Sequence, residues 1–102
     1  MSTFESEQWW VVALGRTLVW ARLRGRRSGS AEVFDSDGSH LSYDSEDSAR
    51  AALMDSDFVS FDGLDDEDAE RLGIDLEDTE PPQAEDDDEL RRFMVQPRAG
   101  AD

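Results

Sequence analysis

The sequence predicts an α+β fold, in which one helix packs on a face of a small, mostly antiparallel sheet of about five strands. Three observations favour this class. Two β-rich runs flank Gly15-Arg16, and two shorter runs flank Asp37-Gly38, which predicts two hairpins. An alanine-rich segment after Ser45 predicts a helix, and a further strand and a short helix follow it. The predicted order of elements is therefore β-β-β-β-α-β-α.

The first predicted hairpin pairs residues 9–14 with residues 17–23. A two-residue turn with glycine first sets the register, which places Leu14 opposite Thr17 and Val12 opposite Val19. Side chains alternate between the two faces of a strand. One face then carries Trp10, Val12, Leu14, Val19, Ala21 and Leu23, and the other carries Trp9, Val11, Ala13, Leu18, Trp20, Arg22 and Arg24. Because both faces are apolar near the turn, we expect each to be covered, or one to contact a partner.

The second predicted hairpin joins residues 31–34 to residues 40–43. With Asp37-Gly38 at its tip, the facing pairs are Phe34 with Leu41 and Asp35 with His40, and Tyr43 shares the side of Phe34. A three-residue loop with a bulge is the alternative, and it shifts this register by one residue.

The helix that follows begins after a cap at Asp44 or Ser45 and ends at residues 55–57. Residues 58–61 predict a fifth strand, and the helical crossover before it allows this strand to lie parallel to its neighbour. Asp62-Gly63 turns the chain into a short helix over residues 65–72, which Gly73 ends. The expected core combines Phe34, Leu41, Tyr43, Leu53 and at least one of Phe58 and Phe61.

Apolar residues divide the chain into three parts. Residues 1–8 predict a flexible N-terminal tail, residues 9–74 the α+β domain, and residues 75–102 an acidic, largely disordered tail. Residues 90–95 are an apolar and basic exception within that tail. We expect this segment to dock on the Trp9/Trp20 face of the first hairpin, and a dimer sealed by the same face is the alternative. The residues assigned to this tail or dimer contact are Trp9, Trp20, Arg22, Arg24 and Phe93.

Charge is strongly sorted along the 102 residues, whose formal net charge is −16. Residues 32–89 hold 23 acidic residues and two arginines, whereas residues 16–27 hold five arginines and no acid. Such a field repels nucleic acid and anionic lipid and attracts basic proteins. Trp20, Arg22 and Arg24, with Arg26 as a further candidate, lie on one strand face and have the composition of a single-stranded nucleic acid platform. The net charge argues against direct nucleic acid binding, and neutralisation by the acidic tail or by a second copy is the preferred interpretation.

Composition also indicates the cellular location and the type of genome to expect. The chain has no cysteine, which excludes disulfide and thiol chemistry. The acidic N-terminal residues lack the positive charge of a signal peptide, and the apolar stretch 9–23 is too short to span a bilayer, so we expect a cytoplasmic bacterial protein without membrane contact. All ten basic residues are arginine and lysine is absent, which is typical of a GC-rich genome or, as the alternative, of a halophile.

Catalytic and metal motifs are weak in this sequence. Asp35, Asp37, Ser39 and Glu46 match part of a calcium loop, but His40 occupies the position that requires glycine, so turn chemistry explains the acids better. His40 with Asp35 is conceivable as a general base pair, and an exposed cross-strand pair is the preferred interpretation. We therefore predict no catalytic residues, no metal site, no cofactor and no enzyme activity.

The sequence favours a small, acidic, non-enzymatic protein that binds a basic protein partner as an inhibitor. In kind rather than in motif it looks like immunity proteins and DNA mimics, whose carboxylates imitate phosphates. The residues assigned to the partner contact are Asp55, Asp57, Asp62, Asp65, Asp66, Glu67 and Asp68. One alternative is a structural acidic domain whose charge serves solubility. A second is a weak metal or nucleic acid binder. We expect a monomer or a weak homodimer.

Overall fold

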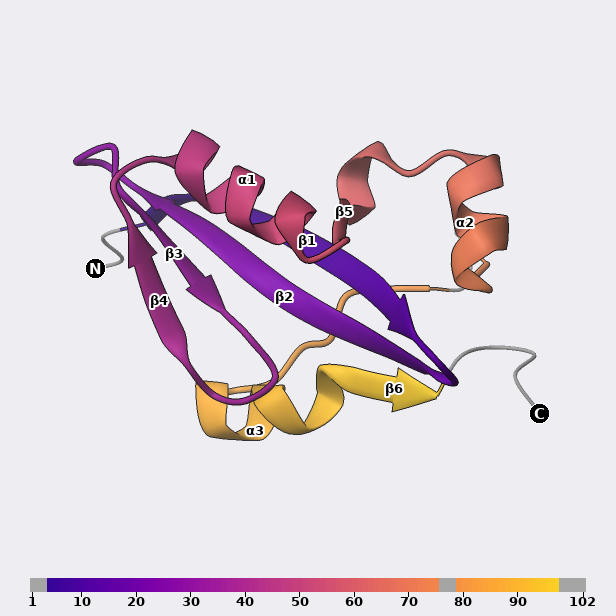
Figure 1. Cartoon of the computed structure of the whole chain (residues 1–102). Coiled ribbons are helices and arrows are strands. Elements are labelled where there is room, and N and C mark those ends of the chain that lie inside the picture. Colours follow the sequence, from indigo (N-terminus) through magenta and orange to yellow (C-terminus); the bar gives the residue numbers. More distant parts are fainter. Residues whose placement is uncertain (1–3, 76–78, 98–102) are drawn as a thin grey trace.

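The computed structural model describes residues 4–75 and 79–97 of the chain. It confirms the α+β class, with an antiparallel sheet of strand order β4-β3-β2-β1-β5 and a sixth strand, β6, paired with β2 (Figure 1). The elements are β1 (Phe4–Leu14), β2 (Thr17–Arg26), β3 (Ala31–Phe34), β4 (His40–Tyr43), α1 (Glu46–Asp55), β5 (Val59–Ser60), the 3-10 turn η1 (Phe61–Gly63), α2 (Asp66–Leu72), α3 (Asp87–Phe93) and β6 (Val95–Pro97).

The first hairpin has the predicted register. Leu14 pairs with Thr17 and Val12 with Val19, and Gly15 takes the positive φ of 60° that the tight turn requires. Strand β1 begins at Phe4 rather than at Trp9, so the segment expected to be a flexible tail over residues 1–8 overlaps the strand from Phe4 onward. This longer pairing reaches the arginine-rich end of β2.

The preferred register of the second hairpin is wrong by one residue, and the alternative register, shifted by one residue, is the one observed. Phe34 pairs with His40, and Val33 pairs with Leu41. The reason is the loop between the strands, where the Asp35 carboxylate accepts hydrogen bonds from the backbone N–H groups of residues 37 and 39, at 3.0 and 3.3 Å. A one-residue shift moves every side chain to the other face of the sheet.

The expected single core is right only in part, because Tyr43 and Phe58 pack in the cluster of Leu53 but Phe34 does not. Phe34 lies in the cluster of Trp20, whereas Leu53 lies in a second cluster with Val33 on the opposite face. Leu41 is 47% exposed. With the shifted register, the Phe34 ring lies on the face of the sheet opposite α1, so Phe34 and Leu53 cannot share one core.

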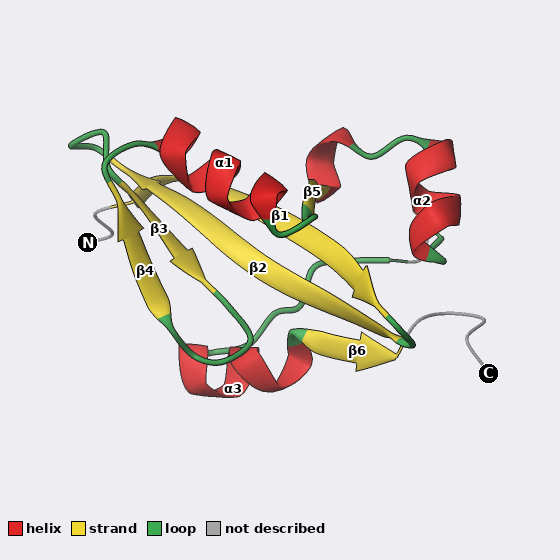
Figure 2. Cartoon of the chain, viewed as in Figure 1, coloured by secondary structure: helices red, strands yellow, loops and turns green. Residues whose placement is uncertain are grey.

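Helix α1 packs on the sheet through Ala49 and Leu53, which are both buried (Figure 2). Ser45 caps the helix by accepting a hydrogen bond from the Ser48 N–H at 3.1 Å. The cluster on this face of the sheet consists of Trp10, Ala21, Leu23, Ala31, Val33, Ala49 and Leu53. One face of the first hairpin is thus covered by a helix, as its apolar character requires.

Strand β5 runs antiparallel to β1, with Val59 beside Val11 and Ser60 beside Trp10. The parallel arrangement that the helical crossover allowed is wrong, because the chain reverses after α1 and enters the sheet at the edge formed by β1. Helix α2 forms as predicted, with Asp65 as its N-cap and Gly73 in the left-handed conformation at φ 73° as its C-cap.

Helix α3 and strand β6 lie within the segment expected to be an acidic tail (Figure 1). Strand β6 pairs with residues 17–19 of β2, on the same edge that β3 occupies at residues 22–25. Between these two pairings, the Trp20 N–H donates a hydrogen bond of 2.7 Å to the Met94 carbonyl oxygen. One edge of β2 is therefore closed by two separate segments of the chain.

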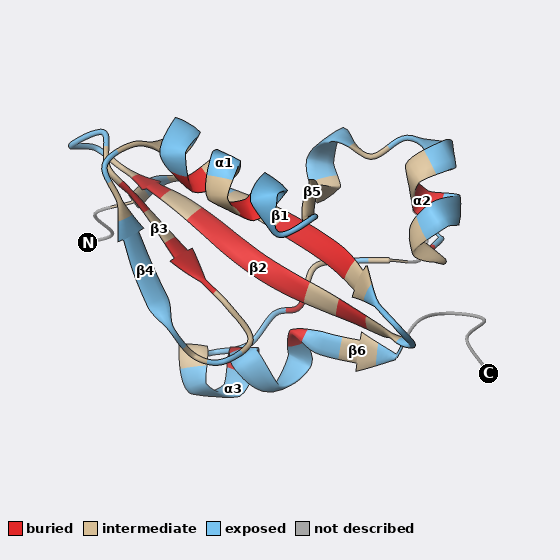
Figure 3. Ribbon diagram, in the orientation of Figure 1, coloured by how far each residue is buried: buried red, intermediate tan, exposed pale blue. Residues whose placement is uncertain are grey.

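The second face of the sheet is covered by this C-terminal segment together with η1 and α2. The buried residues gathered there are Val11, Leu18, Trp20, Phe34, Ala69, Ile74, Leu90 and Met94. The buried residues of β1 and β2 are concentrated in the middle of these strands and point to both faces of the sheet (Figure 3). The long central hairpin is thus the middle layer of the molecule.

Candidate functional site

The seven carboxylates assigned to partner binding, called the acidic surface below, follow the chain from the end of α1 to the first turn of α2. They are Asp55, Asp57, Asp62, Asp65, Asp66, Glu67 and Asp68. All are exposed except Asp68, which is half-buried. Acids in the first turn of α2 also complement the helix dipole, so part of this charge stabilises the fold.

Two members of the acidic surface have structural partners. The Asp65 carboxylate accepts a hydrogen bond of 2.8 Å from the Asp68 N–H and so caps α2. The Asp68 carboxylate pairs with Arg71 at 3.0 Å. Among residues 4–75 and 79–97, the other five carboxylates have no ion pair or side-chain hydrogen bond; they are Asp55, Asp57, Asp62, Asp66 and Glu67.

A hollow of about 270 Å³ brings Asp57 and Asp68 together between β1, β5 and α2. Its apolar lining comes from Val12, Ala13, Val59 and Leu72, and Arg71 completes it. The remaining members of the acidic surface do not line this hollow. A partly apolar hollow with carboxylates in its wall matches a long basic side chain, which has an apolar stem and a charged head.

Asp57 has an unusual backbone conformation. Its φ of 68° is the only positive value at a non-glycine residue in the part of the chain that the structure describes. Glycine is the usual residue where a helix ends in this conformation, because a side chain there is strained. The N–H groups of Asp57 and Phe58 donate to the carbonyl oxygens of Met54 and Leu53, each at 3.0 Å, so this conformation closes the end of α1.

The structure brings together only some of the residues that the sequence assigned to the tail or dimer contact. Trp20 is fully buried, and Trp9 meets it edge-on with ring centroids 6.1 Å apart. Leu90 and Met94 are buried in the same cluster as Trp20. Phe93, the residue that the sequence favoured, is 47% exposed. On a short helix only one face can point at the sheet, and residues 90 and 94 share that face.

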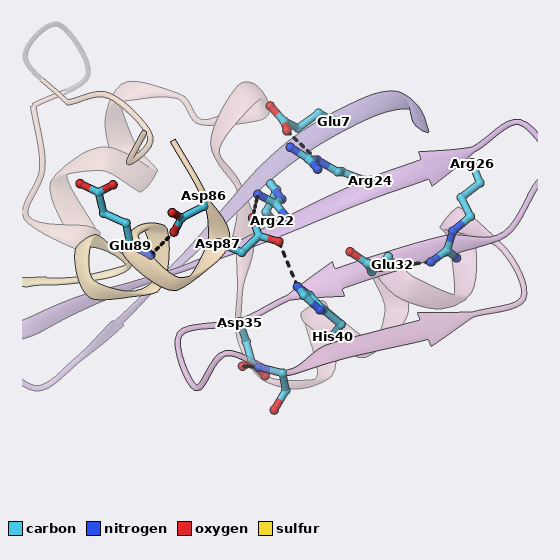
Figure 4. Close-up of polar contacts among 11 residues, drawn as sticks. Glu7, Arg22, Arg24, Arg26, Glu32, Asp35, His40, Asp86, Asp87 and Glu89 are labelled. Carbon is cyan, nitrogen blue, oxygen red and sulfur yellow. Dashed lines mark hydrogen bonds and ion pairs between the residues drawn. The ribbon is translucent and has the colours of Figure 1, made fainter. Parts of the chain in front are cut away.

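Arg22 lies buried at the centre of a small polar cluster (Figure 4). Its Nη1 donates to Oδ1 of Asp87 at 3.0 Å, and Oδ2 of Asp87 lies 3.2 Å from Nε2 of His40. The hydrogen bond from Arg22 is the main cause that lowers the pKa of Asp87 below its ordinary value of 3.8, against desolvation, which raises it. His40 thus contacts Asp87, and the predicted pairing with Asp35 is wrong because of the shifted register.

The other arginines of β2 are paired with carboxylates of this chain. Arg24 donates from Nε to Glu7 at 2.9 Å, and Arg26 pairs with Glu32 at 3.1 Å (Figure 4). Their guanidinium groups also lie over the ring of Phe4, each 5.3 Å from its centroid. Neutralisation of this basic stretch therefore comes from the sheet itself as well as from α3.

The sequence interpretation expected the acidic tail to neutralise the arginines of β2 but did not single out Asp87, and it missed Glu7. Asp86 caps α3 by accepting from the Glu89 N–H at 2.8 Å. An aspartate followed three residues later by glutamate, just before an apolar residue, is a recognised helix start, so this pattern could have placed Asp87 on a helix. The Asp35 carboxylate accepts hydrogen bonds from backbone N–H groups of its own loop. Within the described ranges, no group of three or more metal-ligating side chains comes together.

No protein-family model, curated protein or solved structure matches this chain. Within residues 4–75 and 79–97, none of the helices combines the length and apolar character needed to cross a membrane.

Proposed function

We propose that this chain is a non-enzymatic protein that binds a basic protein partner through the acidic surface. The observation that carries this proposal is the hollow of about 270 Å³ beside α2, which Asp57 lines together with apolar residues and in which its carboxylate has no partner among the described residues. A lysine or arginine of the partner would place its stem against Val12, Val59 and Leu72, and its charged head at Asp57.

The backbone conformation of Asp57 offers a test of this assignment. A glycine would remove the strain at φ 68° but would also remove the carboxylate from the hollow. Asp57 therefore offers a way to separate binding from stability, since its replacement by glycine should weaken binding without lowering the free energy of unfolding.

The finer form of the proposal is an inhibitor in the manner of an immunity protein or a nucleic-acid mimic. The net charge of −16 attracts a basic protein over a long range and accelerates association. Spaced carboxylates on an exposed surface resemble a row of phosphates, so a partner with a basic nucleic-acid cleft is the class that this surface fits.

A capture experiment tests the proposal with variants of equal charge. The surface variant carries Asp57→Asn, Asp62→Asn and Asp66→Asn, and the control variant carries Glu5→Gln, Asp44→Asn and Glu80→Gln. All six residues are exposed, and none of their carboxylates has an ion pair among the described residues. Each immobilised protein is exposed at low salt to a lysate of the host cells, and bound proteins are identified by mass spectrometry.

We expect one basic protein to be captured by the wild type and by the control variant but not by the surface variant. Purified, this protein should bind with defined stoichiometry, and a double-stranded oligonucleotide should compete if the partner's cleft binds nucleic acid. Equal loss of capture in both variants would show that only total charge matters. That result would favour the alternative, in which the acidity serves solubility.

A further inference from the structure

Strand β4 forms one edge of the sheet. Within the described ranges it pairs with β3 alone, so the backbone N–H and C=O groups on its outer side have no strand beside them. Such an edge is a template for another extended segment, which adds to the sheet through backbone hydrogen bonds. Pockets beside the edge then select the side chains of the added strand.

A hollow of about 110 Å³, called the α1–β4 groove below, lies beside this edge between α1 and the sheet. Figure 1 shows α1 and β4 diverging from the corner at which the strand leads into the helix. The lining is mostly apolar, with Ala21 and Val33 from the sheet and Ala52 and Leu53 from α1. The edge strand is thus combined with a pocket on the face that α1 covers.

The apolar wall of the α1–β4 groove is accessible from outside. Leu41, which β4 contributes to the lining, is 47% exposed. Tyr43, Ala52 and Phe58 also line the groove and are half-buried. Another side chain can therefore reach these residues, and its arrival would remove their exposed apolar surface from water.

The size of the groove favours a branched aliphatic side chain. An apolar cavity of about 150 Å³ holds a benzene molecule. The smaller volume of about 110 Å³ therefore suits leucine better than an aromatic ring.

The charge around the groove favours a basic occupant over a second copy of this chain. Asp35 is the one charged residue in the described lining, and Asp37 lies exposed in the same loop. Neither carboxylate has an ion pair among the described residues. A second copy would bring a further net charge of −16, whereas a segment with arginine or lysine beside its leucine is attracted.

We propose that the α1–β4 groove binds an extended, basic segment of another protein. The segment pairs with the outer edge of β4 and inserts a leucine between α1 and the sheet. Side chains two residues apart share one face of a strand, so a basic residue two positions from the leucine stays on the side of Asp35. None of the carboxylates of the acidic surface lines this groove, so it is a second site beyond the proposed function.

The test is an NMR titration of the ¹³C,¹⁵N-labelled full chain at constant ionic strength. Acetyl-Arg-Thr-Leu-Thr-Arg-amide is the probe, and the comparison peptides replace its leucine by alanine or both arginines by glutamate. We expect the probe to shift the methyl resonances of Leu41 and Leu53 until they saturate, and to protect the outer N–H groups of β4 from solvent exchange. The alanine peptide should bind about tenfold more weakly, and the glutamate peptide should not bind.

Ala52→Leu fills the groove and should weaken binding of the probe about tenfold or more. Ala51→Leu, at an exposed position of the same helix, is the matched control and should leave binding unchanged. If Ala52→Leu does not fold, the comparison of the leucine and alanine peptides on the wild type decides alone. Equal affinities of these two peptides, or β4 N–H groups that stay unprotected, would overturn the proposal. Methyl shifts that grow with protein concentration alone would overturn it in favour of a second copy of this chain.

Discussion

Asp87 neutralises a buried charge and connects two strands of the sheet to α3. Its carboxylate accepts from Arg22 of β2 and contacts His40 of β4, while its backbone belongs to α3. Arg22 is almost fully buried, and a buried guanidinium without a counter-charge is strongly unfavourable. The lowered pKa of Asp87 has the hydrogen bond from Arg22 as its main cause, so the ionised form of this carboxylate stabilises the folded state.

Replacing Asp87 by asparagine should lower the free energy of unfolding by about 1–3 kcal/mol at neutral pH, a range reduced by the 40% exposure of the Asp87 side chain. The folded-state pKa is below the ordinary 3.8, so this stability is present above pH 3.8 and is lost as the pH falls through the folded value. Urea unfolding of both proteins between pH 3 and pH 7 checks this. A difference that is constant across that range would contradict the assigned role, and Asp88→Asn serves as the control.

Asp57→Gly should leave the free energy of unfolding unchanged or raise it by up to about 1 kcal/mol, because glycine relieves the strain at φ 68° but adds freedom to the unfolded chain. The same substitution should weaken binding of the partner identified by capture. Thermal unfolding and calorimetric titration measure the two effects separately. A clear loss of stability would show that the Asp57 carboxylate has a structural role instead.

At the scale of elements, local sequence signals predicted the first hairpin, α1 and α2 well. Their turns and caps are short-range features, such as Gly15, Ser45 and Gly73, and short-range chemistry determines them. The second hairpin was missed by one residue because the Asp35 side chain closes a longer loop than Asp37-Gly38 alone indicates. For the same reason, the predicted sheet face of Phe34 and the predicted partner of His40 were both wrong.

Helix α3 and strand β6 depend on contacts distant in sequence. A helix of only seven residues has little stability in isolation, so α3 forms because Leu90 and Met94 are buried against Trp20. The sequence analysis expected residues 90–95 to dock on the Trp9/Trp20 face, but the acidic composition of residues 75–89 concealed the helix that begins at Asp87. The partner contact itself could be proposed from charge, but the hollow at Asp57 required the packing of α2 beside β1.

Met94→Ala should lower the free energy of unfolding by about 2–5 kcal/mol, because Met94 is fully buried against the Trp20 cluster. Its neighbour Phe93 is 47% exposed, and Phe93→Ala should change stability by about 0.5 kcal/mol or less. Denaturant unfolding followed by tryptophan fluorescence compares the two. Equal effects of both substitutions would mean that α3 does not dock through the face described.

At the scale of the whole molecule, repulsion between like charges destabilises the compact folded state. The ion pairs of the described chain are mostly exposed, so they offset little of the repulsion that follows from a net charge of −16. Added salt screens this repulsion over about 10 Å at 0.1 M. We therefore expect the melting temperature to rise between 0.02 and 0.5 M sodium chloride, roughly the range over which the Debye length shrinks most. An unchanged or lower melting temperature would indicate that local ion pairs stabilise the fold more than the repulsion from the net charge destabilises it.

The central claim is that the acidic surface, rather than net charge in general, binds a basic protein. The most direct measurement is the affinity for the partner identified by capture, determined by calorimetry over a series of salt concentrations. The proteins compared are the wild type, the Asp57→Asn/Asp62→Asn/Asp66→Asn variant and the equally charged Glu5→Gln/Asp44→Asn/Glu80→Gln variant. The account predicts that affinity falls with salt for the wild type and the control alike, and that the acidic-surface variant binds at least about tenfold more weakly with a shallower salt dependence. Identical affinities and salt slopes for the two variants would contradict it.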